Sequence, residues 1–414
     1  MTDIDIAASR PVPMGLARLA TTAFRGGDLR PLAADLAAKL AGNHRDAAAL
    51  YDLAIIFQLF GEREKGLAQL ARALSLERVY HRPSPPAEAE PLSLLMFAVP
   101  GDFMANTPIE FILQDAPISL HIAYIGTDGS PPSPLPDHDV AFVGIGESTE
   151  AKPPLAGLAS HLAQWPRPVL NAPLRIADLA RERLFRVLAD ARGIAIPATV
   201  EVDRRTLSSM ADGILTPHAA LPDADSFPII VRPVGSHAGH GLERLDGPEA
   251  IGRYLEGQPS QRFFLSRFID YSSPVDGLFR KYRIAIIDGE PFLCHMAISR
   301  HWMVHYLNAG MTEDAAKRAE EAAVMSSFKT DFARRHATAF AALHERIGLD
   351  YFAVDCAESC DGRLLIFEAD TAMIIHSMDP PEMFPYKAAQ MSKAYAAFQA
   401  MLRRAAGREA KPGA

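Results

Sequence analysis

Cysteine is scarce in this sequence, with three residues in a chain of 414. So few cysteines exclude a disulfide framework in a chain of this length and favour a reducing compartment, so we expect a cytoplasmic protein. Two of the three, Cys356 and Cys360, are four residues apart. No second pair of cysteine or histidine residues completes a four-ligand zinc set with them, so zinc is not expected.

Basic charge and long apolar runs are also lacking. The chain has 42 Lys and Arg residues against 50 Asp and Glu residues, which gives a formal net charge of -8. A weakly acidic chain lacks the basic surface that nucleic-acid binding requires, so no nucleic-acid partner is expected. No run approaches the roughly 20 apolar residues of a membrane span. The first residues have neither the basic flank nor the apolar core of a signal peptide, so no membrane partner is expected.

Residues 1–82 are expected to be helical. Leu50, Ala54 and Phe57 fall on one helical face, and Gly61 marks a turn before a second apolar face at residues 67–74. Small residues where two helices cross allow close packing. The segment resembles a tetratricopeptide (TPR) repeat, without the usual tryptophan and terminal proline. Its role stays open between a structural cap, a module that binds a protein partner and a homodimer contact.

Residues 83–170 show a different pattern. Short apolar runs at 92–99, 121–125 and 139–145 are separated by turn-like or helix-like segments. Such runs predict buried parallel strands of a small α/β domain. Gly144 and Gly146 follow the third run, but the third glycine and the acidic partner of a dinucleotide-binding turn are missing. A tight turn is therefore expected there.

From residue 171 onward, strands and helices are mixed. Helices are predicted at 176–192, 313–348 and 385–404. Strands are predicted, in chain order, at 229–232, 263–269, 282–287, 291–298, 351–357 and 364–369, the last four forming two hairpins. Strands flanked by helices in this way favour an α+β architecture over a second parallel sheet.

Three carboxylates fall on the last predicted hairpin. Asp355 lies near the end of one strand, and Glu368 and Asp370 are two residues apart on the next, so these two share a face. Carboxylates brought together in an apolar context repel one another unless a positive group lies between them. Oxygen ligands suit Mg²⁺ or Mn²⁺, so a divalent metal site is predicted here. A solvated strand face with unrelated acids is the alternative.

A cation and a glycine-rich loop form the second candidate site. Arg232 ends an apolar strand, and glycines follow at 235, 239 and 241. Glycine lets backbone N–H groups approach phosphate oxygens, and arginine can bond two of those oxygens at once. The sequence has no Gly-Lys-Ser/Thr, so this is not a Walker loop. A simple turn remains an alternative for the glycines.

Basic residues also cluster at 280–283. Lys281 and Arg283 are two residues apart in a predicted strand, so their side chains share a face, and Arg300 follows the hairpin. A basic strand edge can simply discourage aggregation. Beside carboxylates and a glycine loop, these cations are better explained as partners of phosphate or carboxylate groups.

In this order, the three features resemble an ATP-grasp domain over residues 171–401. The likeness is to the carboxylate–amine ligases that include glutamate ligases and D-alanine–D-alanine ligase. Residues 347–355 are similar to the segment before the family's first metal-binding acid. Residues 368–370 are similar to its Glu-x-Asn, with Asp in place of Asn. The resemblance implies an α+β ATP-grasp fold of two α+β lobes, 171–262 and 263–408, preceded by a small α/β pre-ATP-grasp domain, 83–170, and the α-helical TPR-like segment.

The resemblance also implies roles for individual residues. Asp355, Glu368 and Asp370 would bind Mg²⁺ or Mn²⁺, while Arg283 and Arg300 would act on the reacting groups. Arg183 and Arg232 stand where the family usually has lysines that contact the ATP phosphates. A hinge segment would contact adenine, with Arg267 in place of the usual Glu. Asp276 or Asp270 would contact the ribose. The implied cofactor-binding set is Arg183, Arg232, Gly235, Ser236, His237, Gly239, Gly241, Ser266, Arg267, Phe268, Ile269 and Asp276.

The reaction implied by the resemblance is the ADP-forming ligation of a carboxylate and an amine. ATP would phosphorylate the carboxylate of an amino acid or peptide substrate, and an amine would then displace phosphate from the acyl phosphate. His301 or His305 is a candidate base for that amine. Two alternatives stay open: a phosphotransferase that stops after phosphoryl transfer, and a degenerate nucleotide-binding protein that recruits a partner through its TPR-like helices.

Overall fold

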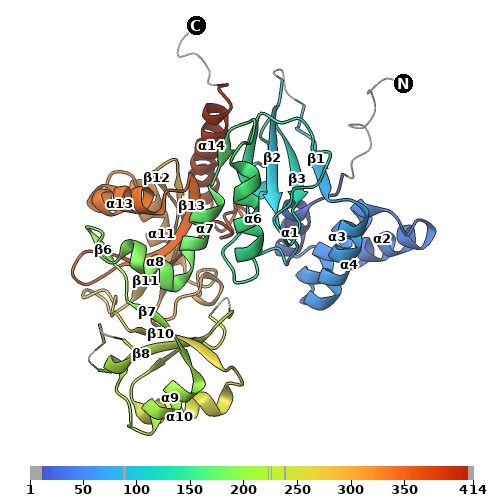
Figure 1. The fold of residues 1–414 in the computed structure, drawn as a ribbon. Helices are drawn as coiled ribbons and strands as arrows, with labels where there is room; N and C mark the ends of the chain where they lie inside the picture. The colour runs from blue at the N-terminus through green and yellow to red at the C-terminus, as the bar shows by residue number, and fades with distance from the viewer. Residues whose placement is uncertain (1–11, 87–89, 222, 225, 237–238, 409–414) are drawn as a thin grey trace, which may run out of the picture.

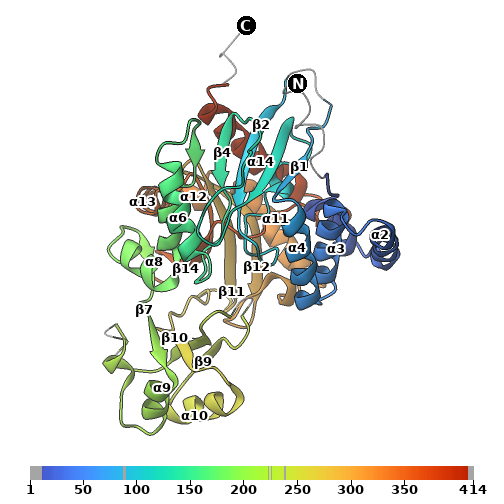
Figure 2. The ribbon, with the colours of Figure 1, turned by 45° about the vertical axis from the view of Figure 1, so that its right-hand side comes forward.

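The computed structural model describes residues 12–86, 90–221, 223–224, 226–236 and 239–408. Three β-sheets and a group of N-terminal helices make up this part of the chain (Figures 1 and 2). No helix within it combines the length and the apolar composition that crossing a membrane would require.

The N-terminal helices pack as one layer against the first sheet. They are α1 (Leu16–Phe24), α2 (Arg30–Gly42), α3 (Ala47–Leu59) and α4 (Arg63–Leu76). A Cβ on Gly66 of α4 would lie 2.8 Å from the carbonyl oxygen of Ala54 in α3, so glycine is what lets these two helices approach closely. Leu50 and Ile56 of α3 share a core with Met96 of the first sheet. The TPR assignment of this segment stays a prediction.

The first sheet has five strands in the order β1-β3-β2-β4-β5. Its strands are β1 (Val79–Arg82), β2 (Leu92–Ala98), β3 (Ile118–Tyr124), β4 (Val140–Val143) and β5 (Val169–Leu170), and its helices are α5 (Ile109–Ile112) and α6 (Lys152–Leu162). β2 is parallel to β3 and β4, and β4 to β5, whereas β1 is antiparallel to β3. The prediction of buried parallel strands in this region is confirmed.

The second sheet forms a separate lobe at the lower end of the molecule in Figure 1. Its four strands are antiparallel in the order β7-β10-β8-β9. The lobe contains β7 (Thr199–Asp203), α9 (Arg204–Ala211), the 3-10 helix η3 (Pro217–Ala219), β8 (Ile229–Pro233), β9 (Glu243–Leu245), α10 (Pro248–Gly257) and β10 (Arg262–Arg267). Leu207, Ile251 and Phe263 are fully buried in a core of its own.

The third sheet, called here the large sheet, has the order β12-β11-β13-β14-β6. Its strands are β6 (Ile194–Ala195), β11 (Phe279–Ile287), β12 (Glu290–Ser299), β13 (Tyr351–Glu358) and β14 (Leu364–Asp370). The helical elements around it are α7 (Pro173–Ile176), η2 (Ala177–Leu179), α8 (Arg181–Leu188), η4 (Tyr306–Asn308), α11 (Ala315–Ser327), α12 (Phe332–Arg335), α13 (Ala337–Ile347) and α14 (Lys387–Ala405). Both predicted hairpins, β11–β12 and β13–β14, are present.

Helix α14 joins the large sheet to the first sheet. The Phe398 ring of α14 contacts Phe142 of β4 at 5.7 Å and Tyr351 of β13 at 5.2 Å between ring centroids. Each of the three residues is less than 2% exposed. Such edge-on aromatic contacts add to the free energy gained by burying the rings. The two sheets and α14 are therefore one packed body, from which the four-stranded lobe projects (Figure 1).

Two long helices predicted from the sequence are wrong. The region 176–192 is interrupted at Ala180, whose ψ of 135° is extended, so α8 begins only at Arg181. The region 313–348 is divided into α11, α12 and α13. Its first break is a turn in which the Ser327 carbonyl accepts the N–H groups of Thr330 and Asp331. Helical periodicity alone does not show where such breaks fall.

The predicted domain boundaries stay predictions. β1, which ends at residue 82, pairs with β3 of the first sheet. β10, which begins at residue 262, pairs with both β7 and β8 of the four-stranded lobe. Strand pairing therefore links the segments before and after residue 82, and those before and after residue 262.

Two buried carboxylates hold the start of α1. Asp52 accepts the N–H groups of Met14 and Gly15 at 2.9 and 3.1 Å, and Glu110 accepts the N–H of Ala17 at 2.9 Å. These bonds satisfy donors that a helix N-terminus leaves open. Burial nevertheless raises the pKa of Asp52 to about 6, since the two N–H groups only partly offset it. Burial likewise raises the pKa of Glu110.

The pKa of Asp52 predicts a pH-dependent stability. Because this pKa lies above the ordinary value of 3.8, the folded chain binds the proton more tightly than the unfolded chain, and stability is gained as pH falls from about 7 to 4. In Asp52→Asn this contribution is absent. We expect the difference in free energy of unfolding between wild type and variant to shift by roughly 2–3 kcal/mol in favour of the wild type over this range. Urea unfolding at both pH values measures it, and a constant difference would contradict the assignment.

Gly157 of α6 predicts a second effect on stability. A Cβ at this position would lie 1.8 Å from the backbone oxygen of Asp128, so Gly157→Ala should lower the free energy of unfolding by about 1–3 kcal/mol or more. Gly252 of α10 is the matched control, because a Cβ there meets nothing within 4 Å. Gly252→Ala should instead raise stability by about 0.5–1 kcal/mol. Thermal unfolding of the two variants compares them directly.

Candidate functional site

A row of polar side chains crosses the large sheet. The strand register pairs His295 of β12 with Arg283 of β11. Arg283 is paired in turn with Asp355 of β13, which lies opposite Glu368 of β14. Directly opposed residues on neighbouring strands place their side chains on the same face. The register shifts directly after this row in two of the pairings, and such bulges redirect side chains.

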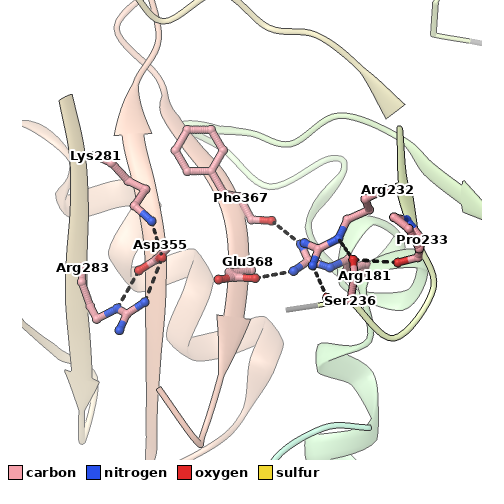
Figure 3. Close-up of polar contacts among 9 residues, drawn as sticks. All are labelled: Arg181, Arg232, Pro233, Ser236, Lys281, Arg283, Asp355, Phe367 and Glu368. Atoms are coloured by element: carbon pink, nitrogen blue, oxygen red, sulfur yellow. Dashed lines mark hydrogen bonds and ion pairs between the residues drawn. The ribbon is translucent and has the colours of Figure 1, made fainter. Parts of the chain in front are cut away.

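Asp355 is enclosed by two cations of β11. Its Oδ1 accepts a hydrogen bond from Arg283 Nε at 2.8 Å, and its Oδ2 accepts from Arg283 Nη2 at 3.0 Å and from Lys281 Nζ at 2.9 Å (Figure 3). The Asp355 side chain is only 2% exposed. Burial alone would raise its pKa, but the charges of Arg283 and Lys281 hold the pKa well below its usual value. Asp355 is therefore ionised and fully paired.

Glu368 faces a cation from a different element. Arg181, the first residue of α8, forms an ion pair with Glu368 and donates to the Phe367 carbonyl oxygen at 3.3 Å. Figure 3 shows Glu368 between Asp355 on one side and Arg181 on the other. Burial raises the pKa of Glu368, but the charges of Arg181, Lys281 and Arg232 together more than offset this, so the pKa lies below its ordinary value.

Arg232 of β8 approaches the same place from the four-stranded lobe. Its guanidinium donates to the Ser236 hydroxyl at 3.2 Å and to the Ser236 carbonyl oxygen. The Ser236 hydroxyl donates to the Pro233 carbonyl oxygen at 2.9 Å, which closes the turn. Burial, followed by the like charge of Arg181, lowers the pKa of Arg232 to about 10, so it remains a cation at neutral pH. Two arginines from different parts of the fold thus face Glu368 (Figure 3).

The glycines after β8 adopt the backbone that the loop requires. Gly235, Gly239 and Gly241 have φ of 78°, 76° and 65°, which side chains disfavour. A Cβ on Gly239 would lie 3.3 Å from Met303 Sδ, so the loop reaches the segment that follows β12. His237, predicted to contact the cofactor, lies outside the described residues.

Asp370 is held by backbone groups. It accepts the N–H of Ala372 at 3.1 Å and of Glu147 at 3.3 Å, and burial raises its pKa. Within the described residues, no three His, Cys, Asp or Glu side chains are grouped closely enough to hold a metal ion. Since Asp355 and Glu368 are paired with cations, the three carboxylates do not fit a shared Mg²⁺ or Mn²⁺. This differs from the expectation that a metal ion would lie between them.

Three other predicted site residues lie away from the row. Arg183 is nearly half exposed and its nearest ion pair is with Asp178, at 3.7 Å. Asp276 binds Arg280 through two hydrogen bonds, at 3.1 and 2.7 Å. Arg300 is exposed directly after β12. The structure brings together none of these three with Asp355.

The predicted hinge lies at the end of the lobe. Ser266 and Arg267 pair with β8, and Arg267 Nε also bonds Asp223 at 3.1 Å. The Phe268 N–H donates to the Pro228 carbonyl oxygen at 3.1 Å. Arg244 lies 4.5 Å from the centroid of the Phe268 ring. Ile269 packs, partly buried, against the main core. Contact of this segment with adenine stays a prediction.

The sequence did not single out Arg181 as a site residue, and it noted Lys281 only as a basic neighbour of Arg283. Arg181 and Arg183 are both basic and are two residues apart in α8, so they point to different sides of the helix. Only the break at Ala180 determines which of them reaches Glu368. The sequence did indicate a role for Lys281, because it shares a strand face with Arg283. In the structure both side chains bind Asp355.

Neutral histidines adjoin these cations. Burial lowers the pKa of His305, and the charges of Lys281 and Arg283 lower it further. Burial and Arg283 also lower the pKa of His295 well below its ordinary value, and its ring contacts Tyr306 at 4.5 Å. Both imidazoles are therefore uncharged at neutral pH and can accept a proton. His301, the other histidine predicted as a base, is exposed.

Removing the charge of Asp355 should destabilise the fold. Asp355→Asn leaves Lys281 and Arg283 without their shared counter-charge, and breaking a buried ion pair in this way costs about 3–5 kcal/mol of unfolding free energy. Asp288→Asn is the matched control, because Asp288 and its partner Arg404 are both more than 40% exposed. That change should cost less than about 1 kcal/mol. Equal losses in urea unfolding would contradict this account of Asp355.

Comparison with known proteins gives structural neighbours only. No family model and no curated protein sequence matches the chain. The D-Ala:D-Ser ligase VanG from Enterococcus faecalis matches with a TM-score of 0.43 and 12% identity, over 75% of this chain and 99% of that one. A D-alanine–D-alanine ligase from Bacillus anthracis, complexed with ATP, matches with 0.43 and 14%, over 77% and 100%. A RimK domain ATP-grasp protein from Sphaerobacter thermophilus matches with 0.40 and 16%, over 73% and 98%. Scores this low do not establish a family, so the function proposed below rests on the side chains of this chain.

Proposed function

We propose that the chain is an ATP-dependent carboxylate–amine ligase that works through an acyl phosphate. The observation that carries this proposal is the meeting of four cations beside Glu368. Arg181 and Arg232 approach from α8 and β8, and Lys281 and Arg283 from β11. Cations held at fixed positions are what a transferring phosphoryl group requires.

The cations have different parts in this reaction. Arg181 and Arg232 bind the phosphates of ATP, with N–H groups of the glycine loop beside them. A substrate carboxylate oxygen attacks the γ-phosphorus, an O–P bond forms, and the bond to the bridging oxygen breaks to release ADP. Arg283 neutralises the negative charge that develops on the acyl oxygen when the amine attacks the acyl phosphate. The three carboxylates do not fit a shared Mg²⁺, so the cations of the chain neutralise the phosphates.

His305 is the base in the second half of the reaction. An amine attacks the acyl carbon, a C–N bond forms, and the C–O bond to phosphate breaks, so phosphate leaves. The amine must also lose a proton, and a half-buried histidine kept neutral by neighbouring cations can accept it. An amino acid or short peptide is the substrate class that supplies both a carboxylate and an amine.

A second candidate function is nucleotide binding without turnover. Arg232 is already bonded to the hydroxyl and carbonyl groups of Ser236, an arrangement that a stable, non-reacting site also favours. In that case α1–α4 would recruit a protein partner. ATP bound without release of ADP, together with loss of partner binding on deletion of residues 1–76, would select this function.

Turnover tests the ligase proposal. The full chain is incubated with ATP and pools of amino acids and dipeptides, in the presence and absence of Mg²⁺, while ADP and new amide products are measured. We expect Arg181→Met to lower kcat/KM by about 100-fold or more, because one charge-assisted bond to the transition state is lost. Arg181→Lys, which keeps the charge, should recover part of the activity.

Arg346→Met is the matched control for Arg181. Arg346 pairs with Asp190, whose side chain is 80% exposed, and it lies on α13, outside the row. Its removal should change kcat/KM by less than about twofold. Absence of ADP with every pool, or equal losses in the Arg181 and Arg346 variants, would contradict the proposal.

A further inference from the structure

Both carboxylate oxygens of Asp355 are already bonded. Arg283 binds them as a fork, and Lys281 adds a third hydrogen bond at 2.9 Å. The Lys281 and Arg283 side chains are only 15% and 20% exposed. A divalent ion that bound Asp355 would have to displace one of these cations, or take its place beside both in a poorly hydrated site. Either change is costly, since like charges are weakly screened there.

The net charge of the whole site also disfavours a divalent ion. Four cations, Arg181, Arg232, Lys281 and Arg283, are arranged around two ionised carboxylates, Asp355 and Glu368. Asp370 is bonded to the backbone N–H groups of Glu147 and Ala372, and burial raises its pKa. A site with this surplus of cations attracts a polyanion and repels a divalent cation.

Two of the cations repel each other in the unliganded site. The charge of Arg181 acts on Arg232, and Glu368 offsets only part of it. Figure 3 shows the two guanidinium groups on the same side of Glu368, each from a different part of the fold. An anion with several oxygens bonds to both guanidinium groups and removes this repulsion.

We propose that this site binds the triphosphate of ATP directly through its own cations, with Lys281 taking the place at Asp355 that a divalent metal ion would otherwise occupy. The inference rests on the proposed ATP site and concerns how that site neutralises phosphate. Binding of ATP then requires no Mg²⁺ and falls steeply with ionic strength.

Calorimetric titration of the full chain with ATP tests this. One titration contains EDTA and no added metal, and the other contains an excess of Mg²⁺. We expect ATP to bind in EDTA at least as tightly as it binds in excess Mg²⁺. ATP binding that requires Mg²⁺, or no ATP binding under either condition, would overturn the proposal.

Lys281→Met sharpens the test, because it removes one cation and one of the two hydrogen bonds to Asp355 Oδ2. ATP binding in EDTA should weaken by about tenfold and should now be strengthened by Mg²⁺. Lys281→Arg should keep the metal-independent behaviour of the wild type, provided that thermal unfolding shows both variants to be folded. Lys393→Met is the matched control, since the Lys393 amine bonds Gln390 on an exposed turn of α14. An unchanged response to Mg²⁺ in Lys281→Met would contradict the role of Lys281.

The outcomes separate this inference from the ligase proposal. Metal-independent ATP binding without ADP release supports the cation site and contradicts the ligase. ADP release with an absolute need for Mg²⁺ in ATP binding supports the ligase and contradicts the cation site.

Discussion

The bonding of Asp355 to Lys281 and Arg283 determines how the rest of the site can be used. A carboxylate that is 2% exposed stays ionised only if its neighbours compensate for lost hydration, and here two cations on one strand do so. Because cross-strand register sets this contact, the whole of β11 and β13 must be in place before Asp355 has its partners. The ion pairs therefore set the local charge of the row, and they form in this register of the large sheet.

The packing behind the row explains why it is held so firmly. On the same strands, Ala285 of β11 and Ala353 of β13 are fully buried against the core that contains α14. Phe398 anchors that helix to both sheets through its two ring contacts. A one-residue slip would move the apolar side chains to the wrong face together with Asp355. Positioning of the charged groups is thus a consequence of apolar packing several residues away.

Much of the fold follows from patterns that are local in the sequence. The alternation and turn residues of both hairpins predicted β11–β12 and β13–β14, and continuous apolar runs predicted β2, β3 and β4. The site could be predicted only in part from the sequence, because ion pairing depends on contacts between distant segments. Arg181 is 187 residues from Glu368, and no periodicity distinguishes it from Arg183. The sequence likewise predicted that the carboxylates lie near one another and that the cations of β11 pair with phosphate or carboxylate groups, but it did not predict that Lys281 and Arg283 both bind Asp355.

The distribution of the cations links binding to the arrangement of the lobes. Lys281 and Arg283 belong to the large sheet, and Arg181 begins α8, which contacts β14 of that sheet. Arg232 alone comes from the four-stranded lobe, which has its own core. An anion that bonds Arg232 and Arg181 together therefore connects the lobe to the main body, whereas an anion that bonds only the β11 cations does not. A chain of phosphates is long enough to do both, so charge placement alone favours an extended polyanion over a single phosphate or carboxylate.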